Sequence, residues 1–420
     1  MEKNRYDICV LGLGYIGLPT ASIFATKGKT VLGVDLVAQV VETINAGRIH
    51  IEEPDLDILV KAAVQSGNLR AAVTPAVADV YIIAVPTPFR ATATNPRAPD
   101  LTYVESATRA LAPVVPSGAL VILESTSPVG TTESIRDWLA DELQKIRPAE
   151  ADTLAASLQY AHCPERILPG QMLKELVSND RIAGGLTHAA AVRARELYQC
   201  FCSAEIFLTD ARTAEMAKLT ENSCRDVNIA FANELSMICD RLKIDVWELI
   251  RLANRHPRVK ILQPGPGVGG HCIAVDPWFI VDAAPEQSRL IRTAREVNDH
   301  KPHFVLDQVK TACRGYARPV IACLGMAFKP DVDDLRESPA LEITAELARS
   351  GLGQILAVEP HVHQLPKALA GLPDVRLVEA EEAIRLANVV VLLVNHRRFK
   401  AIDPASLQGK AVVDTRGFWR

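Results

Sequence analysis

The sequence predicts an α/β protein in which two Rossmann-like, doubly wound parallel sheets are joined by a long central helix. Three observations predict this fold. Short apolar runs rich in β-branched residues alternate with helical patterns at both ends of the chain, an order typical of parallel sheets with helices on both faces. A glycine-rich turn connects the first apolar run to the first helical pattern. Between the two blocks, residues 213–242 contain no Pro or Gly and repeat apolar residues at helical spacing.

The first block, which we place at residues 1–210, alternates strands and helices. Tyr6–Leu11 is predicted as a buried strand and Leu18–Lys27 as the helix that follows it. Further strands are predicted at Thr30–Val34, Val80–Val85 and Leu120–Leu123. The whole chain has 420 residues, and a prior of roughly 150 residues per domain allows about three domains.

The middle block, residues 211–310, is helical, and the third block, residues 311–420, returns to the first pattern. Helices are predicted at Thr213–Leu242 and Val246–His256. The third block has a predicted helix at Ala340–Ser350 and predicted strands at Val320–Leu324, Ile355–Val358, Val389–Val394 and Val412–Val413.

Two stretches of the third block resemble stretches of the first. Ala78–Val85 resembles Ala387–Val394, and both read as buried strands. Ala119–Thr126 parallels Lys410–Gly417, and each of these is a strand that ends in a Thr-containing loop. The similarities indicate an internal pseudo-repeat of one α/β unit.

Composition excludes several classes of function. The hydrophobic share is 48% and the formal net charge is −4, so we expect neither nucleic acid nor an anionic membrane as a partner. No apolar run reaches the roughly 18 residues of a membrane span, and the N-terminus has no signal-peptide pattern. The nine cysteines are an odd, scattered set, which favours a reducing cytoplasm over a disulfide framework and shows no paired zinc ligands, so no metal site is expected.

The segment Gly12–Gly17 is a Gly-x-Gly-x-x-Gly motif between a predicted strand and a predicted helix. Gly12 permits the tight turn, Gly14 lets the backbone approach a pyrophosphate, and Gly17 allows the helix to pack closely on the strand. The helix N-terminus then presents free N–H groups to the phosphates. Asp35 ends the next strand, where a carboxylate accepts hydrogen bonds from a ribose diol and repels a 2′-phosphate. The motif therefore predicts NAD rather than NADP.

Thr87 and Thr126 follow two predicted strand ends, where ligands of such sheets bind. Taken singly, each is as easily explained as a helix cap or a turn residue.

A glycine-rich loop, Gln263–Cys272, delivers a cysteine to the end of the middle block. It is not a Walker A motif, because no Lys follows the glycines. Such a loop lets backbone amides approach a sugar or phosphate. Cys272 stands near basic side chains and shortly before Asp276, so a thiolate nucleophile is one interpretation and an inert thiol the other. His271 is expected to be a packed or loop histidine.

Polar residues also mark the long helix and two other segments. Lys218, Asn222 and Arg225 share one helix face, either as a solvated stripe or as groups that polarise a carbonyl. The rigid Pro before Glu165 and the Arg after it suggest a positioned Glu165–Arg166 pair. A basic cluster that is either a solvated helix end or a phosphate clamp comprises Arg251, Arg255, His256, Arg258 and Lys260.

Together these motifs resemble the UDP-glucose/GDP-mannose dehydrogenase family over essentially the whole chain. The resemblance is carried, in this order, by Gly12–Pro19, Glu124–Gly130, Cys163–Arg166, Glu215–Asn222, Gly267–Cys272 and Phe328–Pro330 with Arg336. It implies an NAD domain, a central helix that also builds a homodimer, and a UDP-binding domain. It further implies a four-electron oxidation of a UDP-sugar that uses two NAD and one water, for surface polysaccharide synthesis.

The resemblance also implies roles for single residues. Cys272 would attack the aldehyde, and Lys218 with Asn222 would act as acid/base and oxyanion partners. Asp276 and Thr126 would hold the catalytic water, and Glu165 would assist hydrolysis. Cofactor contacts are expected, besides the glycines and Asp35, at Tyr15, Ile16, Thr87, Thr132 and Arg336. Substrate contacts are expected at Arg166, Ile167, Lys218, Asn222, Arg225, His256, Arg258, Gly269, Phe328, Lys329 and Arg416.

One departure bears on the substrate. UDP-glucose enzymes of the family usually carry Pro-Lys-Asp after the cysteine, where this chain has Ala274, Val275 and Asp276. This segment and the Pro-Glu-Arg motif are similar to the N-acetylhexosamine branch, with UDP-N-acetyl-D-mannosamine favoured over UDP-N-acetyl-D-glucosamine. Two other classes stay open: a two-electron hydroxyacid or sugar-acid dehydrogenase, which needs no cysteine, and an NAD-binding regulatory protein, which has no use for Lys218, Asn222 and Cys272 together.

Overall fold

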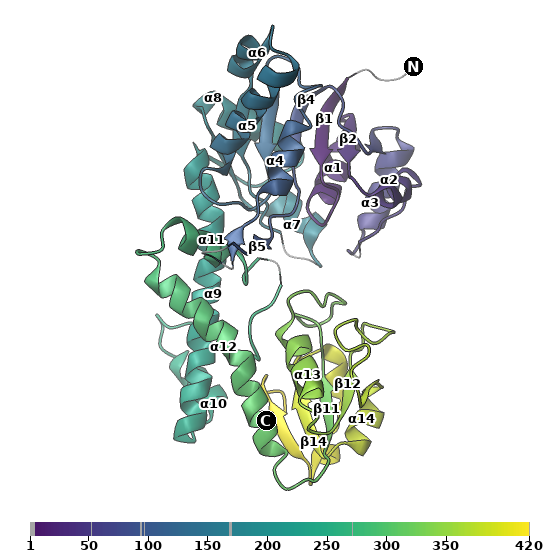
Figure 1. The fold of residues 1–420 in the computed structure, drawn as a ribbon, viewed down its shortest axis with the longest axis vertical. Helices are drawn as coiled ribbons and strands as arrows, with labels where there is room; N and C mark the ends of the chain where they lie inside the picture. The colour runs from purple at the N-terminus through teal and green to yellow at the C-terminus, as the bar shows by residue number, and fades with distance from the viewer. Residues whose placement is uncertain are drawn as a thin grey trace. The chain divides into compact units, whose positions relative to one another are not determined.

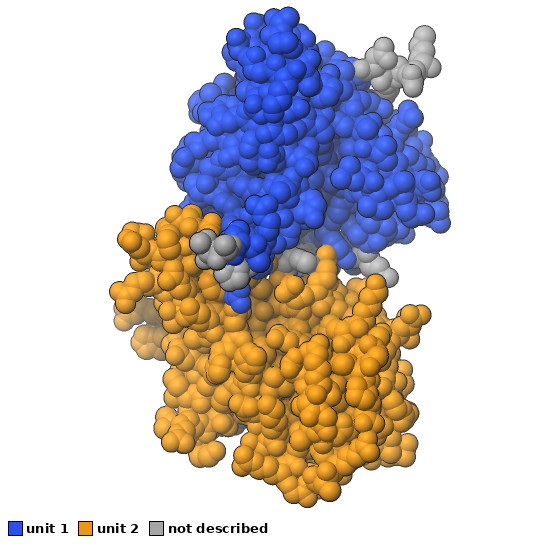
Figure 2. Space-filling view, in the orientation of Figure 1, with its two compact units in different colours: residues 1–221 blue, residues 222–420 orange. Residues whose placement is uncertain are grey.

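The computed structural model describes residues 5–51, 53–92, 95, 97–167, 170–270 and 272–419. The chain divides into two compact units, residues 1–221 and 222–420 (Figure 2). Among the described residues, none of the helices combines the length and hydrophobicity needed to cross a bilayer.

Among the described residues of the first unit, eight strands form one sheet in the order β10-β9-β8-β7-β4-β1-β2-β3. Neighbours pair in parallel except β8 and β9, which are antiparallel. The strands are β1 (Tyr6–Leu11), β2 (Val31–Val34), β3 (Leu69–Ala72), β4 (Ala78–Ile83), β7 (Leu120–Leu123), β8 (Gln159–His162), β9 (Arg181–Gly185) and β10 (Ile206–Asp210). A separate antiparallel pair joins β5 (Phe89–Arg90) and β6 (Ala98–Pro99).

Helices cover both faces of this sheet (Figure 1), which explains why its central strands are largely apolar. Ile8 and Val10 of β1 face one core, and Cys9 and Leu11 face the other. The first core includes α1 (Gly17–Thr26), α3 (Leu56–Gln65), α7 (Met172–Ser178) and α8 (His188–Tyr198). The second includes α4 (Thr102–Arg109), α5 (Thr131–Ile146) and α6 (Ala151–Ser157), while α2 (Ala38–Asn45) packs near β3.

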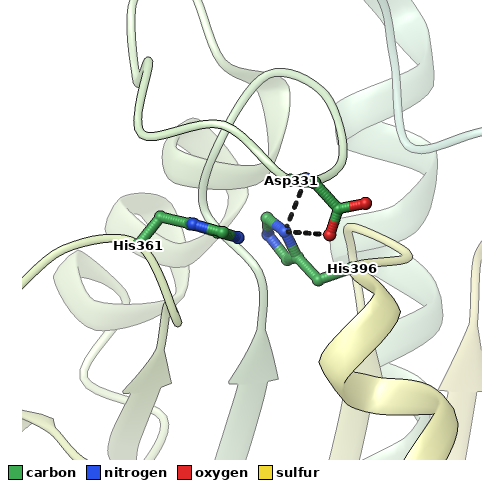
Figure 3. A group of neighbouring side chains, drawn as sticks. All are labelled: Asp331, His361 and His396. Carbon is green, nitrogen blue, oxygen red and sulfur yellow. Dashed lines mark hydrogen bonds and ion pairs between the residues drawn. The ribbon is translucent and has the colours of Figure 1, made fainter. Parts of the chain in front are cut away.

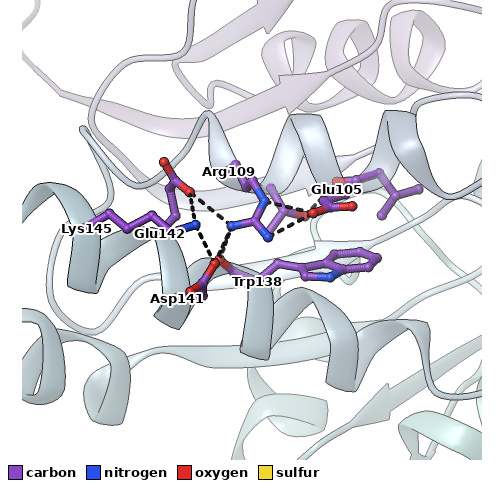
Figure 4. Close-up of polar contacts among 8 residues, drawn as sticks. Glu105, Arg109, Trp138, Asp141, Glu142 and Lys145 are labelled. Atoms are coloured by element: carbon purple, nitrogen blue, oxygen red, sulfur yellow. Dashed lines mark hydrogen bonds and ion pairs between the residues drawn. The ribbon is translucent and has the colours of Figure 1, made fainter.

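The guanidinium of Arg109 joins α4 to α5 at the surface (Figure 4). It pairs with Glu105 at 2.8 Å on its own helix and with Asp141 at 2.8 Å and Glu142 at 3.0 Å on α5. Lys145 adds a pair to Asp141 at 2.7 Å. Exposed pairs of this kind contribute about 0–1 kcal/mol each, so the network orients two helices without defining a site.

The long helix α9 (Ala211–Leu242) is followed in the second unit by α10 (Val246–Ala253), α11 (Asp276–Ala283) and α12 (Arg289–Ala312). The carboxylate of Asp245 accepts hydrogen bonds from the backbone N–H groups of Trp247 and Glu248, which caps α10. Pro302 lies inside α12, a helix that we did not predict from the sequence.

The second sheet is parallel throughout, in the order β13-β12-β11-β14-β15. Helices α12 and α13 pack on one face, while α14 and two 3₁₀ helices pack on the other (Figure 1). The elements are β11 (Val320–Leu324), α13 (Pro339–Arg349), β12 (Gln354–Val358), β13 (Val375–Leu377), α14 (Ala380–Leu386), β14 (Val389–Leu392), η1 (Arg397–Ala401), η2 (Pro404–Leu407) and β15 (Ala411–Asp414).

The two sheets confirm the pseudo-repeat. The run β3-β2-β1-β4-β7 of the first has the same order of connection as β13-β12-β11-β14-β15 of the second. Thus β4 and β14, like β7 and β15, occupy equivalent places, as the paired sequence stretches indicate. Gly12 and Gly325 both have φ +90°, and their N–H groups donate to the carbonyls of Val34 and Val358 at 2.8 Å. The sequence therefore predicted the presence of two α/β sheets but not all of their strands, and the domain limits at 210 and 310 stay predictions.

Candidate active site

The glycine turn after β1 is shaped partly by protein packing and partly by open space. A Cβ on Gly12 would lie 2.7 Å from the carbonyl oxygen of Ala84, and a Cβ on Gly17 would lie 1.8 Å from the oxygen of Gly12. A Cβ on Gly14 would meet no protein atom within 4 Å. Protein packing thus demands Gly12 and Gly17, whereas at Gly14 there is room for a ligand at the N-terminus of α1, as a dinucleotide requires.

Asp35 follows β2 and is held at the rim of this turn. One carboxylate oxygen accepts a hydrogen bond from the Leu13 N–H at 3.1 Å, and the other accepts one from the Val37 N–H at 3.0 Å. The side chain is only half-buried, so its remaining lone pairs can accept hydrogen bonds from a ribose. The glycines and Asp35 together fit NAD.

The loops after β4 and β7 meet through Thr87. Its hydroxyl donates a 2.7 Å hydrogen bond to the carbonyl oxygen of Thr126. Beside it, the Ser125 hydroxyl donates to the carbonyl of Val85 at 2.6 Å. The structure therefore brings Thr87 and Thr126 together at the carboxyl ends of two neighbouring strands.

Thr132 lies at the start of α5 and is buried against Glu215 of α9. Its N–H and hydroxyl donate to one oxygen of Glu215 at 2.8 and 2.6 Å, and the Gly130 N–H donates to the other at 2.6 Å. Burial raises the pKa of Glu215. These bonds fix the beginning of α9 to the NAD-binding sheet. The expected contact of Thr132 with the cofactor stays a prediction.

Glu165 is buried and has a partner that we did not predict. One carboxylate oxygen accepts a 2.6 Å bond from the guanidinium of Arg181 on β9, and the other accepts the N–H of Arg166 at 2.7 Å. The guanidinium of Arg166 instead pairs with Glu221 of α9 at 2.7 Å. Glu165 and Arg166 are therefore joined through the Arg166 backbone, while each side chain has a different charged partner. The neighbouring Ile167 packs at the edge of the first core.

Glu124, which directly follows β7, is a second buried carboxyl near Glu165. It accepts a 3.0 Å hydrogen bond from the hydroxyl of Tyr198. Burial and the charge of Glu165 raise the pKa of Glu124 to about 8. Arg181 is the buried cation beside both carboxyls, and its ion pair is with Glu165, so Glu124 keeps its proton at neutral pH.

Three of the expected catalytic residues meet in the second unit. The carbonyl of Cys272 accepts the N–H of Asp276 at 2.8 Å, so the cysteine loop turns directly into α11. Asp276 is buried, and its carboxylate accepts a hydrogen bond from the amide of Asn222 on α9. The Cys272 side chain is exposed. Lys218, half-buried, lies one turn before Asn222 on the same helix. His271 lies outside the described residues.

The glycines of the cysteine loop are demanded by packing within the second unit. A Cβ on Gly269 would lie 2.2 Å from the carbonyl oxygen of Glu337, and one on Gly267 would lie 2.9 Å from the ring of Pro339. At Gly270, φ is +84° and a Cβ would lie 3.0 Å from the ring of Phe328. The loop thus packs closely against the segment around residues 337–339. This packing alone requires glycine at these positions, whether or not a ligand also does.

A buried polar network holds the other end of this loop. The amide oxygen of Asn233 on α9 accepts the Gly265 N–H at 2.9 Å, and its NH₂ group donates to Asn298 of α12 at 2.8 Å. Asn298 donates in turn to Asp226, which pairs with Arg295 at 2.6 Å. All four side chains are almost inaccessible to solvent. We did not predict this network, since its residues belong to two helices far apart in sequence.

Arg416 also reaches the loop. Its guanidinium donates to the carbonyl of Leu393 at 3.0 Å, and a Cβ on Gly265 would lie 2.6 Å from it. Burial lowers the pKa of Arg416 to about 10. Phe328 and Lys329 stand at the other side of the loop, with the ammonium 5.6 Å from the ring centroid. The structure therefore gathers the three C-terminal substrate candidates around the glycine loop.

The remaining candidates are more exposed. Arg225 is exposed on α9, and His256 and Arg258 are exposed just beyond α10, where the Arg258 N–H donates to the imidazole at 3.4 Å. Arg336 is exposed and forms an ion pair with Asp334 at 2.7 Å.

Comparison with known proteins decides the family. Residues 6–202, 212–300 and 322–420 match the NAD binding, central and UDP binding domains of the UDP-glucose/GDP-mannose dehydrogenase family. The chain belongs to this family. Its members are oxidoreductases that act on nucleotide sugars with NAD, so this chain is an NAD-dependent nucleotide-sugar dehydrogenase with a UDP-binding domain.

Three relatives illustrate the match. An NDP-N-acetyl-D-galactosaminuronic acid dehydrogenase of Ralstonia nicotianae is 58% identical over 98% of this chain and 96% of its own length. A UDP-N-acetyl-D-mannosamine dehydrogenase of Escherichia coli K12 is 57% identical over 98% and 99%. The solved structure of a UDP-D-ManNAc dehydrogenase from Pyrococcus horikoshii has a TM-score of 0.86 at 38% identity, covering 99% of this chain and 96% of that one.

Proposed function

We propose that the protein oxidises the 6-hydroxyl of UDP-N-acetyl-D-mannosamine to a carboxylate through a covalent thioester on Cys272. The observation that carries the proposal is a pair of hydrogen bonds. The Asp276 N–H donates to the carbonyl of Cys272, and the Asn222 amide donates to the carboxylate of Asp276. A cysteine delivered by a tightly packed loop into polar neighbours suits a positioned nucleophile. The names of the E. coli and P. horikoshii relatives support the choice of sugar.

The overall reaction converts the primary alcohol, two NAD⁺ and one water into the carboxylate, two NADH and three protons. NAD supplies the acceptor for both hydrides. Lys218 takes up the proton of the 6-hydroxyl as the first hydride leaves C6. The thiolate of Cys272 then forms a C–S bond to the aldehyde carbon, which becomes tetrahedral and can release the second hydride. Water attacks the resulting thioester, the C–S bond breaks, and the thiolate is regenerated.

The neighbouring residues support these steps. The ammonium of Lys218 and the amide of Asn222, one helical turn apart, stabilise the oxygen of the tetrahedral species. Asp276 and Thr126 orient the water, and Glu165, which forms an ion pair with Arg181, accepts a proton during hydrolysis. Contacts to UDP and the sugar come from Arg166, Ile167, Arg225, His256, Arg258, Gly269, Phe328, Lys329 and Arg416, and the cofactor contacts include Tyr15, Ile16, Thr132 and Arg336.

Stoichiometry tests this function. NADH released per sugar is counted with NAD and the UDP-linked N-acetyl derivatives of mannosamine, glucosamine and galactosamine. Two NADH per UDP-N-acetyl-D-mannosamine, with slower turnover of the other two, is the expected result. The galacto sugar is included because the R. nicotianae relative is named for it at almost the same identity. Turnover of the galacto sugar alone would replace the manno assignment.

Substitution of Cys272 tests the mechanism. Cys272→Ser is nearly isosteric, so binding of UDP-sugar and NAD should persist while turnover falls by several orders of magnitude, because the groups of a covalent mechanism act as a unit. Cys224→Ser is the matched control, because that thiol is also exposed. Two NADH per sugar at near wild-type rate from Cys272→Ser would show that no thioester forms.

We further propose that the functional unit is at least a dimer assembled on α9. Phe231, Ile238 and Leu242 recur on one face of this helix and are 52%, 46% and 61% exposed. A helix face with large apolar side chains in water calls for a partner layer. Light scattering at micromolar concentration should give at least twice the chain mass of 45.7 kDa. A monomer would contradict the proposal.

A further inference from the structure

Glu359 follows β12, in the place that Asp35 occupies after β2 in the first sheet, but its side chain is buried. Glu359 is 5% exposed. One carboxylate oxygen accepts the backbone N–H groups of Met326 and Ala327 at 2.7 and 2.9 Å. The other accepts the N–H of His361 at 3.2 Å. The carboxylate of Glu359 thus binds the turn after β11. This turn is the counterpart of the dinucleotide turn of the first sheet.

His396 extends this arrangement from the loop after β14. Its side chain is fully buried, with the ring edge-on to Phe399 at 5.4 Å. The Asp331 N–H donates to Nδ1 at 3.0 Å, so Nδ1 is the unprotonated nitrogen (Figure 3). Nε2 therefore carries the hydrogen and donates it to Glu359 at 3.1 Å. One imidazole joins the acid of β12 to the far end of the 326–331 loop.

Asp331, at the far end of this loop, has a strained backbone and is held by two neighbouring residues, His396 and Arg397. Asp331 has φ +60°, which a non-glycine residue rarely adopts. Its carboxylate accepts the N–H and the guanidinium of Arg397 at 3.0 and 2.8 Å. Glu359 therefore fixes residues 326–327 and His396 with Arg397 fixes residue 331. Phe328 and Lys329 lie between the two fixed points.

Asp331, His361 and His396 could also be considered as metal ligands, because their ligand atoms lie within 4.8 Å of one another (Figure 3). The hydrogen bonds argue against an ion. The Nδ1 lone pair of His396 already accepts from Asp331, and Nε2 faces Glu359. The carboxylate of Asp331 is bonded to Arg397. Nε2 of His361 is buried and has no hydrogen-bond partner among the described residues, but the groups that would share an ion with it are already bonded and hold a loop.

We propose that Glu359 and His396 are positioning residues that hold Phe328 and Lys329 in the geometry required to bind the UDP-sugar. The proposal rests on the substrate role assigned to Phe328 and Lys329 under the proposed function. A loop held by two buried hydrogen-bonding groups loses little freedom on binding, and releasing it adds an ordering cost to every binding event. Neither residue touches substrate, so the chemistry itself is not theirs.

The test compares His396→Phe, His396→Gln and Glu359→Gln with wild type. Phe keeps the ring volume and removes both hydrogen bonds, whereas Gln can still donate to Glu359. We expect His396→Phe and Glu359→Gln to raise KM for the UDP-sugar at least tenfold, with KM for NAD within twofold and kcat within threefold. His396→Gln should recover part of the sugar KM. His363→Phe, at an exposed histidine of the same domain, is the matched control.

Calorimetric binding of UDP alone separates this proposal from the proposed function, because it needs no turnover. Weaker UDP binding in His396→Phe supports the positioning role even if the sugar assignment fails. Equal rises in both KM values, or unchanged UDP binding, would overturn it. If His396→Phe does not fold, Glu359→Gln gives the same readout. Activity that EDTA removes and zinc restores in wild type, but not in His396→Phe, would replace the positioning role with a metal site.

Discussion

The two parallel sheets share one connection order and one glycine turn, yet they use the acid at the end of the second strand in opposite ways. Asp35 is half-buried, accepts two N–H groups, and keeps an accessible edge. Glu359 is buried, accepts three N–H groups, and faces His396. The longer side chain of glutamate reaches under the turn. The same place in a fold can therefore bind a ligand or hold a loop, and only the side chains decide which.

The turns themselves differ in the same sense. In the first sheet α1 begins at Gly17, directly after the turn, and Gly14 leaves room beside it. In the second sheet Ala327 takes the place of Gly14, is almost inaccessible, and donates its N–H to Glu359. Helix α13 begins only at Pro339. The second turn thus has no helix N-terminus to offer a phosphate, and its amides are already used.

The largest expected effect tests what the sheets share. Gly325→Ala should destabilise the protein by about 2–6 kcal/mol, through overpacking and a left-handed backbone, and Gly17→Ala by about 1–3 kcal/mol or more through overpacking alone. The new Cβ would lie 1.8 Å from the oxygen of Gly12 or 2.4 Å from Cβ of Val394. Thermal unfolding measures the loss. Gly315→Ala, with positive φ but open space, is the control and should cost far less. A neutral Gly325→Ala would break the equivalence of the turns.

The next effect tests what the sheets do not share. Gly14→Ala should leave the melting temperature within about 1 °C, since no protein atom lies within 4 Å of the new methyl group. KM for NAD should rise about tenfold, which corresponds to about 1.4 kcal/mol, because the methyl occupies the approach of the pyrophosphate. Steady-state kinetics at saturating UDP-sugar measures it. An unchanged KM would show that the cofactor does not approach Gly14.

How much of this could be predicted from sequence depends on how local each signal is. The strands β1, β7 and β11 were predicted at their observed limits because β7 and β11 are continuous apolar runs and β1 has one polar residue, Asp7. The strand-like run expected before Cys163 is β8, whereas β9 was missed because its segment, RIAGG, is short and partly glycine. Helix α12 was missed because of Pro302 and its charged outer face.

The site divides in the same way. Motif residues such as Gly14 and Cys272 follow from local patterns. Arg181 beside Glu165, and His396 beside Glu359, are partners only in three dimensions, since 16 and 37 positions separate them along the chain. An acidic residue within an apolar stretch of sequence indicates that a partner exists, because a charge in a core requires one. The sequence does not indicate which residue that partner is.

A smaller effect concerns cofactor choice. Asp35→Asn should lower the preference for NAD over NADP about tenfold, because the amide no longer repels a 2′-phosphate. The ratio of kcat/KM for the two cofactors measures it. Glu359→Gln, the same chemical change at the equivalent place in the other sheet, should leave that ratio unchanged. A wild-type preference for NADP would remove the role assigned to Asp35.

The smallest effect contrasts two buried acids through pH. The pKa of Glu124 is raised by burial from 4.5 to about 8, so the folded state holds a proton that the unfolded chain releases above pH 4.5. Its contribution to stability is therefore present below pH 4.5 and is lost as pH rises through 8. Burial also opposes ionisation of Glu359, but His396 and the backbone N–H groups outweigh it and lower the pKa. That contribution is present above pH 4.5 and is lost as pH falls through the lowered value.

Glutamine does not titrate, so Glu124→Gln and Glu359→Gln isolate the two contributions. Relative to wild type, Glu124→Gln should gain a few °C in melting temperature between about pH 5 and pH 8.5, on the scale expected for changes of about 1 kcal/mol in a domain of this size. Glu359→Gln should be less stable than wild type at pH 7, and its deficit should shrink below pH 4.5. Melting curves from pH 3.5 to 8.5 measure both. Parallel profiles for the two variants would mean that both acids are ionised, and the contrast between the sheets would then lie in geometry alone.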